Sequence, residues 1–252
     1  MTHRLNRNGH RSHTPETSRS GWPLLRLPLF ALLLAGPFYA SLQAQSAPTE
    51  TEMSQYSGLF EAVAKFSDTS IVKQRIAETS DIETRDRHHR SALLVAAYVG
   101  NHAAMRSLVA AGADPNAFDD ERYDMVTIAA VANDLETMRL ALELGNKPGN
   151  VTSPYDGTAL IAAAHLGHVE VVQTLIEAGA PLNHVNNLGW TALIESIVLG
   201  DGAAKHTATL KALVDAGADV NRADGNGRSP LMLATQRGYD AMIKILTNAG
   251  AR

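Results

Sequence analysis

The side chains of this sequence that could perform acid–base or metal chemistry occur in short, isolated clusters. His88 and His89 are adjacent, but a metal site needs further ligands that converge on the same point, and no spacing in the sequence supplies them. Asp119, Asp120 and Glu121 form an acidic run that could act as paired carboxylates. Because neither a nucleophile nor a metal ligand accompanies them, the acidic run is interpreted as a solvated hairpin tip and the histidine pair as a solvated or partner-facing surface.

The sequence offers no other set of catalytic or cofactor-binding residues. It contains no cysteine, which excludes disulfides, thiolate metal sites and a cysteine nucleophile. His165 and His168 are three residues apart at a predicted helix junction, where a structural role is favoured. We therefore predict a protein with no catalytic residues, no cofactor and no metal ion.

A repeated pattern of glycines defines the elements that carry these clusters. Five glycines follow apolar segments at intervals of 33, 34, 38 and 33 residues: Gly112, Gly145, Gly179, Gly217 and Gly250. A fixed period in this range is typical of stacked repeat proteins.

The best-formed unit predicts two short helices. The segment "TALIAAAHLG" (158–167) is the first, and "HVEVVQTLIEAG" (168–179) is the second, with apolar residues three or four positions apart on one side. Gly179 stands where a helix end requires the left-handed conformation. One such pair cannot bury its own apolar side, so the units are expected to stack.

The unit resembles the ankyrin repeat. The resemblance rests on "GWTALIESI" (189–197), "GHVEVV" (167–172) and "GADVN" (217–221), and it extends over residues 58–252. It implies an all-α solenoid of stacked helix pairs with β-hairpin fingers. A degenerate N-terminal cap is expected at 58–85, followed by repeats at about 86–118, 119–152, 153–185, 186–223 and 224–252.

Three departures from the family pattern lead to further expectations. The family's hydrogen-bonding histidine is replaced in every repeat, so this position should be held mainly by packing: Leu94, Thr127, Ile161, Ile194 and Met232. The second repeat has Asp124 for a threonine and Asn133 for a glycine, which predicts local irregularity. The fourth repeat has five additional residues, "DGAAK" (201–205), expected to protrude as a loop opposite the hairpins, either as decoration or as a second contact site.

The N-terminus resembles an export signal. The first 44 residues carry five arginines and one glutamate, and an apolar run at 27–40 precedes small residues. We predict cleavage after Ala44 and a flexible linker at 45–57. An uncleaved anchor and a cytosolic protein with an apolar tail are the alternatives. The apolar run is about half of what a bilayer requires and contains Pro28 and Pro37, which favours cleavage.

Residues 45–252 then carry 17 basic and 25 acidic side chains, a formal charge of −8. An acidic body argues against nucleic acid as a partner, because phosphate binding needs a basic surface. From the export signal, the chain is expected to be periplasmic or secreted, to come from a Gram-negative bacterium, and to make no membrane contact after cleavage. It is also expected to be monomeric.

The family resemblance implies a protein-binding adaptor that recognises its partner through the concave face and the hairpin tips. Tyr, Trp and Arg, which dominate interface energetics, are frequent among the candidate contact residues: Arg87, His88, Arg90, Tyr98, Tyr123, Tyr155, His165, Leu166, Leu188, Trp190, Leu199, Arg228 and Arg237. Trp190 is predicted to be an exposed anchor. Alternative functions are an accessory factor that stabilises or activates a periplasmic enzyme, an effector delivered to a host cell, and, least favoured, a hydrolase.

Overall fold

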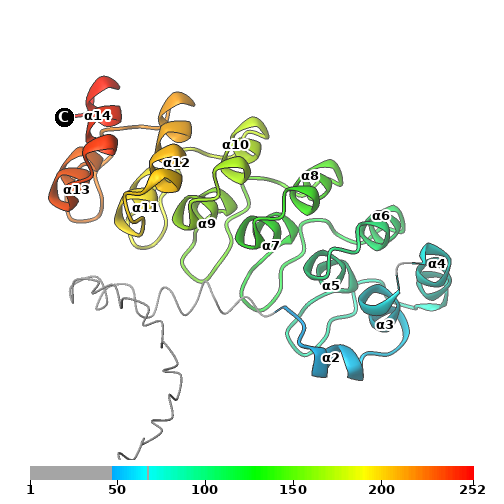
Figure 1. Cartoon of the computed structure of the whole chain (residues 1–252). Helices are drawn as coiled ribbons and strands as arrows, with labels where there is room; N and C mark the ends of the chain where they lie inside the picture. Colours follow the sequence, from blue (N-terminus) through cyan, green and yellow to red (C-terminus); the bar gives the residue numbers. More distant parts are fainter. Residues whose placement is uncertain (1–46, 67) are drawn as a thin grey trace, which may run out of the picture.

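The computed structural model describes residues 47–66 and 68–252, which form an elongated stack of helix pairs (Figure 1). The predicted leader, 1–44, lies outside the described residues. Within the described ranges the regular elements are helices, with isolated β-bridges at Arg85–Ser91 and Thr152–Gly157. The predicted all-α solenoid is confirmed. None of the helices in these ranges is long and apolar enough to cross a membrane.

The helices lie in two rows, and the hairpins project on one side (Figure 1). The row next to the hairpins contains the first helix of each pair: α3 (Gly58–Lys65), α5 (Ala92–Tyr98), α7 (Met125–Ala132), α9 (Ala159–Leu166), α11 (Ala192–Val198) and α13 (Pro230–Arg237). The outer row contains the second helices: α4 (Thr69–Glu78), α6 (His102–Ala110), α8 (Leu135–Glu143), α10 (Val169–Glu177), α12 (Ala204–Asp215) and α14 (Asp240–Asn248). A short helix, α2 (Glu50–Gln55), precedes both rows.

Side-chain caps set the start of the first helix in each of the five repeats. The capping residue accepts a hydrogen bond from the backbone N–H three positions later, which satisfies a group that the helix itself leaves unpaired. The caps are Ser91, Asp124, Thr158, Thr191 and Ser229. At the far end of the pair, Gly179 has a φ of 83°, and Ala180 N–H closes the helix on the Leu175 carbonyl at 2.9 Å.

The core is the apolar interface between neighbouring pairs. In the third repeat Leu160, Val171, Val172 and Leu175 are fully buried. At the position where the family has its histidine, the side chain is buried in four repeats, as expected: Leu94, Thr127, Ile161 and Ile194. In the last repeat Met232 is 48% exposed, since no further pair covers it.

The irregularity expected in the second repeat is absent from its helices. Asp124 accepts from Thr127 N–H at 2.8 Å and so caps α7 as threonine does elsewhere. Asn133 adopts the left-handed conformation, with a φ of 56°, at the end of α7. Asparagine tolerates this conformation better than most residues, so each substitution preserves the geometry.

Polar side chains between the two helix rows tie neighbouring pairs together. A residue just before or at the start of the second helix bonds to a carbonyl near the end of the preceding first helix, at 2.9–3.0 Å: Asn101 to Val63, His168 to Ala130, His206 to His165, and Tyr239 to Gly200. The side chains that donate these bonds stand at equivalent positions in their repeats. They satisfy carbonyls that helix ends leave without partners.

The five additional residues of the fourth repeat do not form the freely protruding loop that was predicted. The last two extend α12 at its N-terminus, and Asp201 contacts the buried His206 at 2.7 Å. A side chain added at Gly202, where φ is 70°, would collide with the ring of Tyr239. The segment therefore packs between the fourth and fifth repeats, although Asp201 and residues 203–205 remain exposed.

The segment 45–57 was predicted to be a flexible linker, and its described part is partly ordered instead. Thr49 and Glu52 form a capping box that starts α2. Composition alone indicated a linker because the segment has few apolar residues. In the structure it is ordered by the polar contacts of Glu52 and by the packing of Pro48 and Tyr56.

We predict that Leu175→Ala destabilises the fold by about 2–5 kcal/mol, the usual cost of truncating a buried leucine. Chemical denaturation measures the change. Gln173→Ala, on the exposed side of the same helix, is the matched control and should leave the midpoint nearly unchanged. An effect of Leu175→Ala no larger than the control would contradict the assigned core.

We predict that Gly202→Ala lowers the melting temperature more than Gly238→Ala does. Both glycines have similar positive φ values, 70° and 68°, so the backbone strain is matched, but only Gly202 faces the Tyr239 ring. Thermal unfolding followed by circular dichroism compares the two variants. Equal shifts would mean that the 201–205 segment is not packed against Tyr239.

Candidate protein-binding face

Four of the five hairpin tips are tight turns organised by one polar side chain. In the last repeat Asp224 Oδ1 accepts from the N–H groups of Asn226 and Arg228, both at 2.9 Å. Asp86, Asp119 and Asn186 make the corresponding pairs of bonds in the first, second and fourth repeats. The third repeat closes its tip differently, with Thr152 N–H donating to the Gly157 carbonyl at 2.7 Å.

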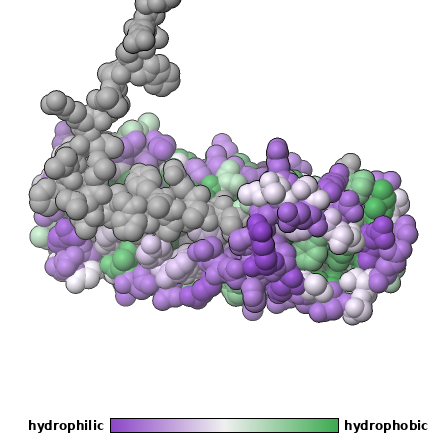
Figure 2. Space-filling model, turned by 90° about the horizontal axis from the view of Figure 1, so that it is seen from below, coloured by the Kyte–Doolittle hydropathy of each residue, from purple (hydrophilic) through white to green (hydrophobic). Residues whose placement is uncertain are grey.

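Backbone hydrogen bonds connect successive tips. Asp120 N–H donates to the His88 carbonyl at 3.2 Å, and Asn187 N–H to the Tyr155 carbonyl at 2.9 Å. The tips and the adjoining side of the first helices form one surface, which we call the recognition face. Viewed from the hairpin side, this part of the molecule is mainly hydrophilic with separate apolar patches (Figure 2). A surface fixed in this way incurs little ordering cost when it binds.

Ten of the thirteen predicted contact residues are accessible to solvent. Arg87, Leu188 and Arg237 are exposed. The following are partly buried: His88, Tyr98, Tyr155, Leu166, Trp190, Leu199 and Arg228. The hydroxyl of Tyr98 is already used within the stack, because it donates to Asp119 of the next hairpin at 2.7 Å.

Three predicted contact residues are buried, which corrects their assignment to the surface. Arg90 is 0% exposed beneath α2, where it binds Asp86 and Glu52. Tyr123 is 3% exposed and packs into the core. His165 is 3% exposed because its ring faces the next repeat.

Trp190 is partly buried and packs against the core, so the prediction of an exposed anchor is wrong in that respect. It occupies the base of its hairpin, immediately before the helix cap Thr191, as Arg90 and Tyr123 do in their repeats. At the base the side chain folds back toward the first helices, whereas a tip residue such as Leu188 remains 37% exposed.

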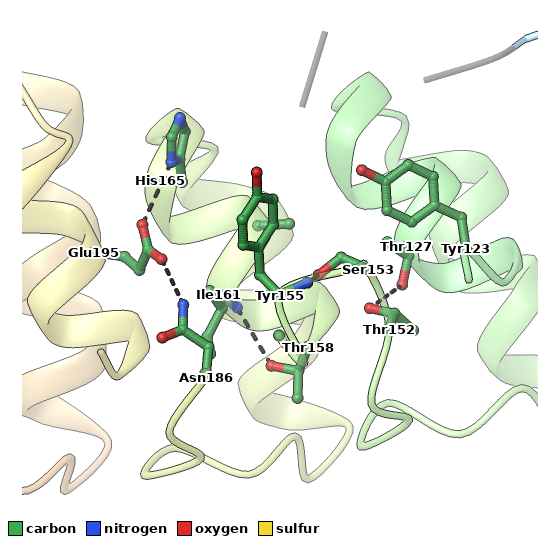
Figure 3. Close-up of a pocket in the computed structure, with 12 residues that line it drawn as sticks. Tyr123, Thr127, Thr152, Ser153, Tyr155, Thr158, Ile161, His165, Asn186 and Glu195 are labelled. Atoms are coloured by element: carbon green, nitrogen blue, oxygen red, sulfur yellow. Dashed lines mark hydrogen bonds and ion pairs between the residues drawn. The ribbon is translucent and has the colours of Figure 1, made fainter. Parts of the chain in front are cut away.

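A small pocket lies between the second, third and fourth repeats (Figure 3). Its volume of about 30 Å³ is far below that of a cofactor site. Tyr123 and Tyr155, from the second and third hairpins, both line the pocket. Deeper in, Glu195 Oε1 accepts from Asn186 at 2.9 Å, and Glu195 Oε2 lies 3.4 Å from His165 Nδ1.

Glu195 is fully buried, and burial raises the pKa of its carboxyl group despite the contacts with His165 and Asn186 that lower it. The carboxyl group of Glu195 on α11 connects the fourth hairpin, through Asn186, to α9, through His165.

The candidate metal ligands of the sequence are not brought together. In the described ranges no three or more His, Asp or Glu side chains converge in a geometry that could hold a metal ion. His88 instead contacts Glu52, with 2.9 Å between Nε2 and Oε1.

Two buried carboxylates near the recognition face, Glu195 and Glu52, were not predicted from the sequence. Glu195 lies within the apolar helix "ALIESI", and a charged residue in such a setting was a usable signal of a buried polar partner. Glu52 had no comparable signal, because a glutamate in a polar segment normally faces water. Only its contacts with the first hairpin distinguish it.

We predict that Glu195→Gln removes a pH-dependent loss of stability. Since the folded pKa is raised above 4.5, the protonated carboxyl favours folding at low pH, and this contribution is lost as the pH rises through the folded pKa. The neutral amide avoids that loss, so the variant should melt at a higher temperature than the wild type above that pKa. Glu177→Gln, an exposed change on α10, is the control. Parallel melting curves against pH would contradict the prediction.

Comparisons with known proteins agree with this geometry. A family model described as ankyrin repeats in three copies matches residues 126–224, a single ankyrin repeat matches 88–120, and a further ankyrin model matches 203–247. The ankyrin repeat protein YahD of Escherichia coli K12 is 34% identical over 190 residues, which cover 75% of this chain and 94% of YahD.

Solved structures give the same result. The crystal structure of an ankyrin repeat domain from Acinetobacter baumannii is 41% identical, with a TM-score of 0.72, and the match covers 77% of this chain and 98% of that one. A chain in the complex of an endopeptidase from Bdellovibrio bacteriovorus with its immunity protein has a TM-score of 0.62 at 20% identity, covering 77% and 98% respectively; that match shows the fold alone. With the stacked helix pairs, their caps and the linked hairpins, these matches establish that the chain belongs to the ankyrin-repeat family.

Proposed function

We propose that this chain is an exported, non-catalytic adaptor that binds a protein partner through the recognition face. Ankyrin-repeat proteins are generally protein-interaction modules built on a scaffold that is typically non-catalytic. The observation that carries the proposal is the row of hairpin tips, which present accessible side chains and of which the first four are joined by backbone hydrogen bonds. A preformed row of this kind suits recognition of a folded surface or an extended segment.

The chemistry of the accessible residues supports a protein partner. Tyr155, Leu188 and Trp190 belong to neighbouring repeats and provide apolar surface, while Arg87 and Arg237 provide charge at the two ends. Such mixtures are typical of interface centres with polar edges. The periplasmic or secreted location remains part of the proposal and is supported by the basic and apolar pattern of residues 1–44.

Capture of partners from an envelope extract tests the proposed function. The chain is expressed with its leader, and N-terminal sequencing of the purified protein should begin near Gln45. A partner retained by this protein should bind Tyr155→Ala/Leu188→Ala at least about tenfold more weakly, a loss of about 1.4 kcal/mol. Arg106→Ala, in the exposed Arg106–Glu143 pair of the outer row, is the control.

Trp190 provides a direct optical measurement, because it is the one tryptophan after residue 44. Its emission should shift to the blue when the partner covers the recognition face. Equal binding by the Tyr155/Leu188 variant and the wild type, or weakening only by Arg106→Ala, would contradict the proposal. A captured enzyme whose activity rises on binding would support the accessory-factor alternative.

A further inference from the structure

The short helix α2 lies across the tip of the first hairpin (Figure 1). A helix of six residues is unstable alone, and helices normally dock through an apolar side. In α2 the one buried residue is Glu52. The capping box keeps its carboxylate in place, since Glu52 Oε2 accepts from Thr49 N–H at 2.7 Å. Within the helix the buried contact is thus made by a charge, while the flanking Pro48 is buried and Tyr56 packs against the core.

Three basic side chains of the hairpin surround this carboxylate. Glu52 Oε1 accepts from Arg87 at 3.0 Å (Nε) and 2.7 Å (Nη2), and from Arg90 Nη2 at 3.2 Å; it lies 2.9 Å from His88 Nε2. Burial raises the pKa of Glu52, but the hydrogen bonds from Thr49 and Arg87 and the charge of Arg90 outweigh it and hold the pKa at about 2. Hydrogen bonds between guanidinium groups and carboxylates are among the stronger polar contacts.

The last repeat shows the same turn without a covering helix. Arg228 Nε donates to Asp224 at 2.8 Å, as Arg90 Nε does to Asp86 at 2.8 Å. The Arg228 side chain is 36% exposed, whereas that of Arg90 is 0% exposed. The comparison indicates that the arginine is positioned by its own turn. In the first repeat Glu52 of α2 and Tyr56 bind it, and a following repeat, which the last repeat lacks, also lies beside it. Arg90, the most deeply buried of the three basic residues, is therefore oriented by its own hairpin through Asp86 and does not require Glu52 for that orientation.

We propose that Arg87, His88 and Arg90 form a carboxylate-binding pocket for an acidic segment of a protein partner, and that α2 occupies this pocket until the partner displaces it. The identity of the partner as a protein rests on the proposed function; the pocket can be tested without it. Displacement breaks the ion pairs of Glu52, including one to Arg87, whose side chain is 65% exposed, so that this pair is screened by salt. Glu52 is the one buried residue within α2, and the apolar contacts of the segment are made by the flanking Pro48 and Tyr56.

A peptide that competes with α2 tests the pocket. The probe is a fluorescently labelled peptide of residues 47–57, and the receptor is the whole chain carrying Glu52→Gln. Glutamine preserves the capping box but removes the charge, so the pocket is vacated more often while α2 can still form. The peptide should bind this variant at least about tenfold more tightly than the wild type, because only the uncovered fraction of the protein can bind.

Matched controls isolate the charge of Glu52. Glu50→Gln, an exposed change on the same helix, should bind the peptide as weakly as the wild type does. A peptide with glutamine at position 52 should lose binding, and so should Arg87→Ala placed in the Glu52→Gln chain. Increasing salt should weaken the complex.

Equal peptide affinities of Glu52→Gln and the wild type, or retention of binding in Arg87→Ala, would overturn the pocket. If Glu52→Gln fails to fold, hydrogen exchange of α2 in the wild type replaces it: excess peptide should speed exchange of amides 50–56, and unchanged protection would overturn the inference. A natural partner that binds normally despite Glu52 and Arg87 substitutions would leave the proposed adaptor function intact while overturning the pocket.

Discussion

The whole structure depends on one constraint: a single helix pair cannot bury its own apolar side. Leu175 and Val172 are fully buried because neighbouring pairs pack against their repeat. The same constraint explains the regular caps. Asp124 and Thr158 differ chemically, yet each places an oxygen where the first helix needs an acceptor, so α7 and α9 start at equivalent positions and can stack.

Stacking also generates a second, polar layer of order. His168 and Tyr239 reach carbonyls of the preceding pair, and Asn187 joins its hairpin to the one before it. These bonds satisfy backbone groups that helix ends and tips would otherwise leave to water. Their consequence for function is a row of tips held in register, so that side chains from separate repeats act as one surface.

The two ends of the stack solve the problem of an uncovered hairpin differently. The last tip leaves Arg228 partly open, while in the first repeat Glu52 of α2 and the hydroxyl of Tyr56 bind Arg90. An electrostatic cover is weaker against salt and competing carboxylates than an apolar one, because exposed charges are readily screened. In this respect α2 differs from α3 and α4, which cap the stack through apolar residues that belong to the core.

The sequence by itself determined the helix pairs, their period and the family, because these depend on local signals: apolar residues three or four apart, capping residues, and a glycine at each helix end. It also correctly predicted that Ile161 and Ile194 would be buried. The tertiary structure alone decided which polar residues face water. Tyr123, His165 and Arg90 are buried by neighbouring repeats or by α2, and Gly202 packs against Tyr239 of the next repeat. Such contacts join distant parts of the chain, so no local pattern encodes them.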